Sequence, residues 1–254
     1  MKHPIILSAL ALLLGGCQPG MLAKMQQPGP LPVESRQKLS DAELALKSGD
    51  FAKAEGLYAE VEKKNAGNID AIEGQALAEM NMGKFDLAVD KFNKVLAKDG
   101  TRWRTLNAIG VLHTLKGQLP QAGQFFAAAD AASPGNPAVL NNWGIAYGIA
   151  GNSPEAVSRL MQAVEAAGAD PQKREQTEMN LAMVYALSGN DRAAEPILRR
   201  YLDPEKARKN LQTYAKIRRD RQQSRQLLEK SFGTPESEKL GAQPLEMLPP
   251  ALNR

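Results

Sequence analysis

The chain has 254 residues, of which 43% are hydrophobic, 24% are charged and only 5% are aromatic, with a net charge of +4. This balance excludes a disordered protein and allows one domain or at most two. Ala and Leu are abundant while Val/Ile alternation is scarce, so we expect an all-helical fold. One cysteine, Cys17, and two histidines exclude an intramolecular disulfide framework and a zinc site built from several Cys and His.

The first sixteen residues have the pattern of an export signal. Ile5–Leu14 is an apolar run about ten residues long, whereas a bilayer span needs roughly 20. The run ends in Leu14-Gly15-Gly16-Cys17, which resembles the lipobox of bacterial lipoproteins. That resemblance implies that residues 1–16 are a signal peptide and that Cys17 becomes the lipid-modified first residue. The alternative is a chance cysteine beside an uncleaved anchor.

Residues 17–34 are predicted to be the lipidated cysteine and a tether. Four prolines, at positions 19, 28, 30 and 32, prevent a regular helix or strand there. Two or more acyl chains anchor a protein stably in a membrane. Gln18 stands where inner-membrane lipoproteins of the enteric type often carry Asp, which favours the periplasmic face of the outer membrane.

The middle of the chain repeats every 34 residues. Glycines recur at positions 49, 83, 117 and 151, and alanines recur five residues later, at 54, 88, 122 and 156. Small residues at Ala42, Ala76, Gly110 and Gly144 pair with large ones at Tyr58, Phe92, Phe126 and Leu160. The period and the Gly-x₄-Ala signal resemble the tetratricopeptide repeat, which implies antiparallel helix pairs stacked into a right-handed α-solenoid.

A fifth repeat follows after an irregular interval, which gives about five repeats over residues 35–204. Gly189 comes 38 residues after Gly151, so four additional residues near Asp170 to Lys173 predict a longer loop or an added turn before the first helix of this repeat.

A long capping helix is predicted over residues 205–231. From Arg192 to Lys230 the cations exceed the acids by seven, so the rest of the chain carries a net charge of −3. We interpret this charge as the solvated face of a capping helix; the alternative is a patch for anionic lipid headgroups or an acidic partner. Residues 232–254 are rich in Pro and unpatterned, which predicts a disordered tail.

No catalytic constellation is present in the sequence. In the predicted mature chain Cys17 is acylated and His113 is the only histidine. The residues needed for a Cys-His pair, a Ser-His-Asp triad or a His-based metal site are therefore not all available. His113 falls where Tyr147 and Tyr185 stand in later repeats, which favours a packing role. We therefore predict that the protein is not an enzyme and has no metal or cofactor.

The remaining chemistry is protein binding. In a repeat stack the first helices line the concave side, and their exposed stripes form a continuous groove. The predicted groove residues are Leu77, Met80, Arg104, Asn107, Val111, Asn141, Ile145, Met179 and Met183. With Arg104 as the single cation, the groove is not suited to gripping a chain-end carboxylate. We expect it to hold an extended or helical segment whose backbone bonds to Asn107 and Asn141, although ordinary helix polarity explains either asparagine alone.

The whole layout resembles the TadD family, lipoproteins of the tight-adherence (Flp) pilus system. That resemblance rests on the lipobox, the tether, the repeats and the capping helix. It implies an outer-membrane-anchored, periplasmic, pilotin-like scaffold whose partner is a secretin or another pilus assembly component. It implies no nucleic acid and no small-molecule substrate. Two other classes stay open: an adaptor that recruits periplasmic proteases or cell-wall hydrolases, and a cell-wall enzyme.

Overall fold

The computed structural model describes residues 30–220, 223, 226–227 and 229, and within these residues it contains helices and no β-strand. Short loops join successive helices, so that they pack as antiparallel pairs. The helices are α1 (Val33–Ser48), α2 (Phe51–Lys64), α3 (Ile69–Asn81), α4 (Phe85–Lys98), α5 (Trp103–Leu115), α6 (Leu119–Ala132), α7 (Pro137–Ile149), α8 (Ser153–Ala166), α9 (Pro171–Leu187), α10 (Asp191–Tyr201) and α11 (Pro204–Ile217). The prediction of an all-α solenoid of helix pairs is confirmed.

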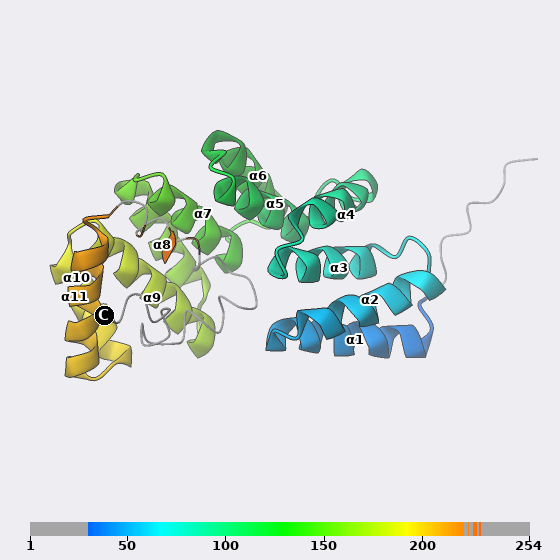
Figure 1. The fold of residues 1–254 in the computed structure, drawn as a ribbon, viewed down its shortest axis with the longest axis horizontal. Coiled ribbons are helices and arrows are strands. Elements are labelled where there is room, and N and C mark those ends of the chain that lie inside the picture. The colour runs from blue at the N-terminus through cyan, green and yellow to red at the C-terminus, as the bar shows by residue number, and fades with distance from the viewer. Residues whose placement is uncertain (1–29, 221–222, 224–225, 228, 230–254) are drawn as a thin grey trace, which may run out of the picture.

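The helix pairs follow one another along the molecule in chain order (Figure 1). Helices α1 to α4 lie toward one end, α5 and α6 lie in the middle, and α7 to α11 lie toward the other end. A main apolar core runs from Ala76 in α3 to Leu227, and a second cluster fills the first repeat around Leu46 and Tyr58. The first helices of the pairs, α1, α3, α5, α7 and α9, are the elements that build the candidate site.

The periodic glycines end the first helix of each pair. Gly83, for example, has φ +76°, in the left-handed region that L side chains rarely adopt. Its amide donates a hydrogen bond to the carbonyl of Met80 in the last turn of α3. Glycine therefore recurs every 34 residues because each repeat needs a left-handed backbone turn at the end of its first helix.

The small and large positions of the repeat meet as the register predicts. A Cβ added to Gly110 would lie 2.9 Å from the Phe126 ring, and one added to Gly144 would lie 2.7 Å from Leu160 Cγ. Both distances are shorter than real Cβ contacts, so glycine is required for these helices to approach so closely. This part of the prediction is confirmed.

The four additional residues of the fifth repeat extend its first helix. Helix α9 has 17 residues, whereas α3, α5 and α7 have 13 each. Asp170 caps the added turn, because its side chain accepts a hydrogen bond from the Lys173 amide at 3.2 Å. Of the two predicted outcomes, the structure shows the added turn.

Two predicted boundaries differ from the structure. Helix α1 begins at Val33 and not at residue 35, because the tether ends at Pro32, whose fixed φ suits a helix start. Helix α11 ends at Ile217, so the single helix predicted over 205–231 is wrong. Asp220 accepts a hydrogen bond from the Gln223 amide at 3.1 Å, which is the cap of a separate helical segment.

The predicted signal peptide, Cys17, most of the tether and the tail over 232–254 lie outside the described residues. Within the described part of the chain, no helix is both long enough and apolar enough to cross a bilayer.

Candidate functional site

A cavity of about 170 Å³ lies among the first helices of the first four repeats. Its apolar wall consists of Leu46 from α1, Leu77 and Met80 from α3, and Ala108 and Val111 from α5. Since these side chains come from three successive repeats, the cavity exists only in the assembled stack.

Polar side chains surround this apolar wall. They are Glu43 and Lys47 from α1, Asn81 from α3, Arg104 and Asn107 from α5, and Asn142 from α7, and the lining is completed by Trp103 and Ala138. An apolar wall with a few placed polar groups is the usual composition of a recognition pocket.

The lining follows the 34-residue register. Glu43, Leu77 and Val111 hold one register position in the first three repeats, and Leu46 and Met80 hold another. The register applied to the first repeat would therefore have identified Glu43 and Leu46, which the sequence analysis missed because it started the groove in the second repeat.

Five of the nine predicted groove residues line this cavity: Leu77, Met80, Arg104, Asn107 and Val111. The other four do not. Ile145 has no exposed surface and Met183 is 4% exposed, because both pack in the main core. Met179 is half-buried and packs against the same core. The continuous groove predicted over repeats two to five is thus corrected to a cavity over repeats one to four.

Asn141 is also a correction, because its side chain belongs to a buried amide network. Asn180 Nδ2 donates to Asn141 Oδ1 at 2.9 Å, Asn141 Nδ2 donates to Asn142 Oδ1 at 3.3 Å, and Asn142 Nδ2 donates to Asn107 Oδ1 at 3.3 Å. The network runs from α9 through α7 to α5 and ends at the cavity. Asn141 therefore stabilises the stack. The amide hydrogens of Asn107 bond to no other described residue, so they can donate to an acceptor on a bound partner.

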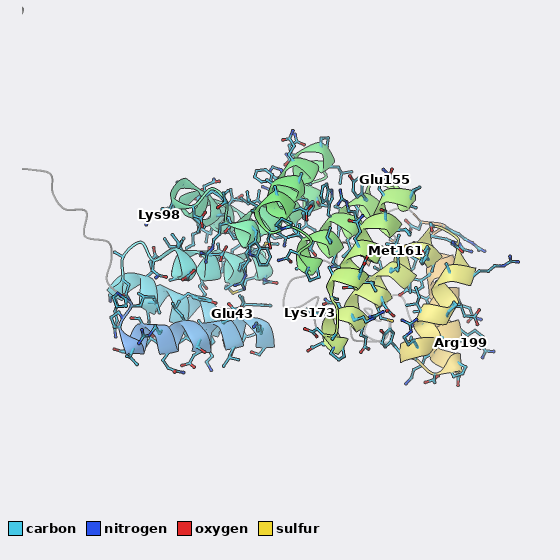
Figure 2. All side chains as sticks on the ribbon, turned by 180° about the vertical axis from the view of Figure 1, so that it is seen from behind. Glu43, Lys98, Glu155, Met161, Lys173 and Arg199 are labelled. Atoms are coloured by element: carbon cyan, nitrogen blue, oxygen red, sulfur yellow. The ribbon has the colours of Figure 1, made fainter. Side chains whose placement is uncertain are left out.

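An ion pair spans the edge of the cavity from the first repeat to the third. Arg104 donates from Nη2 to Glu43 Oε1 at 3.1 Å and from Nη1 to Oε2 at 3.3 Å, and the Tyr58 hydroxyl donates to the same carboxylate at 2.9 Å. Burial raises the pKa of Glu43, but the charge and hydrogen bonds of Arg104 and the bond from Tyr58 outweigh it and hold this pKa below its usual value. Glu43, labelled in Figure 2, is thus ionised at neutral pH.

The cavity lies where consecutive repeats are least closely packed. Helices α4 and α5 have the sparsest contact of any two successive described helices. Polar bonds connect α5 with α3 there: Arg102 Nε and the Thr105 hydroxyl donate to the buried Glu73 carboxylate at 3.2 and 2.7 Å. These bonds hold the two helices together, and Leu77 stays partly exposed at the cavity.

The chemistry of the cavity is that of binding. Pockets for small molecules usually hold about 300 to 1,000 Å³, so a space of about 170 Å³ suits one side chain of a partner better than a metabolite. His113 stacks on the Phe125 ring with centroids 5.1 Å apart, and its Nδ1 lies 2.7 Å from Gln118 Oε1, in agreement with a packing role. Among the described residues no group of His, Cys, Asp or Glu is arranged to hold a metal ion.

Comparison with known proteins supports the repeat fold. Residues 73–137 match the family described as tetratricopeptide repeat. The crystal structure of TTC0263, a thermophilic TPR protein in Thermus thermophilus, is 17% identical, with a TM-score of 0.61 over 71% of this chain and 98% of that chain. MamA 41-end from Desulfovibrio magneticus RS-1 is also 17% identical, with a TM-score of 0.50 over 67% of this chain and 94% of that chain. None of the curated proteins matches the sequence significantly.

These similarities define the class of protein. The matched family, the shared fold and the five helix pairs support a tetratricopeptide-repeat protein, a class of mostly non-enzymatic scaffolds for protein–protein interaction. At 17% identity the solved structures show the fold alone.

Proposed function

We propose that this protein is an outer-membrane-anchored, periplasmic scaffold that binds a protein partner at the cavity and assists assembly of a secretin or another pilus component. The cavity over repeats one to four is the observation that carries the proposal. Its lining includes the partly exposed Leu77 and Trp103, beside the Asn107 amide, whose hydrogens bond to no other described residue. A partner segment that inserts one apolar side chain and offers a backbone carbonyl satisfies both.

The location is proposed from the sequence. The Leu14-Gly15-Gly16-Cys17 pattern supports lipid attachment at Cys17, and Gln18 supports delivery to the outer membrane. The prolines between Cys17 and α1 support a tether that keeps the cavity away from the lipid surface. The pilotin-like role rests on this layout and on its resemblance to the TadD family.

A cavity-filling substitution tests the binding role. Ala138 is exposed at the cavity edge, in the second position of α7, so Ala138→Trp fills the cavity without entering the core. Ala52 is exposed in the second position of α2 and lines neither this cavity nor the hollow between α10 and α11, so Ala52→Trp is the matched control. Each variant, with Cys17→Ser as a third, replaces the native gene, and secretin multimers and piliation are measured.

We expect the native chain and Ala52→Trp to support secretin assembly, and Ala138→Trp to fail while still reaching the membrane. Cys17→Ser should abolish incorporation of a labelled fatty acid into the protein. If deletion of the gene leaves secretin multimers and piliation unchanged, the pilotin-like role is wrong. Recovery of periplasmic proteases or cell-wall hydrolases with the anchored protein, and of no secretin, would instead establish the adaptor role.

A further inference from the structure

The outer face of α11 carries cations that form no ion pair with a carboxylate in the described part of the chain. Arg208, Lys209 and Lys216 are exposed, and Arg219 is exposed in the turn that follows the helix. At 100° per residue the first three fall within about 100° of one side of α11. The opposite side is buried through Ala207, Asn210, Tyr214 and Ile217, so Lys209 and Lys216 point away from the stack, while Arg208 borders the hollow between α10 and α11. We call these four residues the basic face.

Neighbouring acids do not neutralise the basic face, because other cations already bind them. The pairs are Asp191 with Arg218 at 2.8 Å, Glu195 with Arg199 at 3.2 Å, and Asp203 with Lys206 at 3.4 Å. Glu205 is the one carboxylate of α11, and none of the four cations forms an ion pair with a described residue. Residues 192–230 carry a net charge of +7 and the chain outside them carries −3, so the positive charge is concentrated in this part of the sequence.

The shape of the basic face argues against a site for a single small anion. A hollow of about 420 Å³ lies between α10 and α11, but Glu195 and Glu205 line it together with Arg199 and Arg208, so its charges balance. The helical cations of the basic face, from Arg208 to Lys216, instead extend over about 12 Å of helix length. Figure 1 shows α11 at the outer end of the stack, and Arg199 is labelled at that end in Figure 2. An extended anionic surface fits this geometry.

The composition of the basic face distinguishes a lipid surface from a protein partner. Stable protein interfaces have an apolar or aromatic centre in which charged residues are depleted. The large exposed apolar side chains in the described part of the chain are Val33, Leu44, Phe85, Leu87 and Met161, and none belongs to α11. Attraction to anionic headgroups needs charge alone, and each cation near such a surface strengthens binding by about fivefold.

We propose that the basic face of α11 binds the headgroups of anionic phospholipids. This contact is separate from the cavity and does not depend on the identity of the partner. Together with a lipid at Cys17 it would hold both ends of the solenoid near one membrane. The cavity, which lies among repeats one to four, would then keep a fixed orientation to that membrane.

Vesicle binding tests the proposal. The chain from Gln18 to Arg254 contains every described residue and lacks the apolar signal, so it isolates the electrostatic contact. We expect it to bind vesicles that contain phosphatidylglycerol and not vesicles of phosphatidylcholine alone. Roughly 1 M salt, where the screening length is about 3 Å, should abolish binding. Replacement of the four cations by Gln should weaken binding at least a hundredfold, and Glu205→Gln should strengthen it about fivefold.

A variant with the same net charge is the matched control. Arg36, Lys53, Lys63 and Lys94 are exposed on α1, α2 and α4, and none forms an ion pair with a described residue. Their replacement by Gln should leave vesicle binding within twofold of the native chain. Circular dichroism confirms that both quadruple variants fold. Equal loss in the two variants, or retention in the α11 variant, would overturn the proposal, as would binding to polyglutamate or RNA without binding to vesicles.

Discussion

Two junctions between consecutive repeats are built in different ways. Between α2 and α3 the helices touch closely, and the Tyr58 ring lies directly on Gly74: a Cβ added there would be 2.2 Å from Tyr58 Cζ. Between α4 and α5 contact is sparse, and charged side chains bind α5 to the earlier helices through Glu73 and Glu43. One junction is held by close packing and the other by polar bonds over an open space.

The difference explains why the cavity, which spans repeats one to four, takes most of its lining from α3 and α5, in the second and third repeats. Close packing leaves no room for a foreign side chain, since protein interiors contain few voids larger than a water molecule. Polar bonds fix the distance between helices at a few points and leave apolar surface between those points uncovered. The binding site is thus a local opening of a regular stack, and three predictions test the comparison.

The largest effect is expected at the closely packed junction. Gly74→Ala places a methyl group inside the contact distance of the buried Tyr58 ring, and such overpacking costs about 2 kcal/mol. At Gly56, in α2, no atom lies within 4 Å of an added Cβ, so Gly56→Ala should stabilise the protein by about 0.5–1 kcal/mol through helix propensity. Urea denaturation measures both. Equal effects of the two substitutions would mean that the Tyr58 contact does not hold this junction.

A smaller effect is expected at the polar junction. Arg104→Met, Glu43→Gln and the double variant form a thermodynamic cycle, and we expect a coupling of about 1 kcal/mol because the pair is bidentate and half-buried. The more exposed Arg199–Glu195 pair, at 3.2 Å, serves as the control, with about 0.3 kcal/mol expected. A coupling no larger than that of the control would show that the Glu43–Arg104 bond does not hold α1 to α5.

The smallest effect concerns pH. The pKa of Glu43 is lowered in the folded protein, so the unfolded chain binds the proton more tightly. The stability that Glu43 contributes is present above its ordinary pKa of about 4.3 and decreases as the pH falls through the lower folded value. Unfolding free energies measured from pH 7 to pH 3 should therefore decline less steeply for Glu43→Gln than for the native chain. Parallel curves would contradict the lowered pKa.

The sequence predicts the repeat but not the spacing between its copies. The 34-residue register places Gly110 against Phe126 and Gly144 against Leu160, because both contacts lie within one helix pair and depend on local side-chain size. The same register places Leu77, Val111 and Ile145 in equivalent positions, yet Leu77 is partly exposed at the cavity, while Val111 and Ile145 are 2% and 0% exposed. Burial there depends on how far successive pairs separate, which is a property of long-range packing.

The buried polar groups show the same limit. Asn107 and Asn141 are equivalent by register, and sequence reasoning assigns both to a partner. In the structure Asn141 is enclosed by amides from α7 and α9, while Asn107 ends the network at the cavity. The end of α11 is a further case: Asp220, a residue that favours the N-cap position, is the local signal for this break, and it stands between stretches rich in Arg, Gln, Leu and Lys, which favour a helix.

The added turn of α9 shows how such a stack can change length without changing its contacts. Four residues are close to the 3.6 of a full helical turn, so the start of α9 is displaced by about 6 Å along its axis and rotated by only about 40°. The chain arriving from α8 therefore enters on nearly the same side, and Ala182 and Ala186 keep their buried places. An insertion of two residues would turn the entry point by about 200°. Insertions of whole turns are thus the ones that this architecture can accept during evolution.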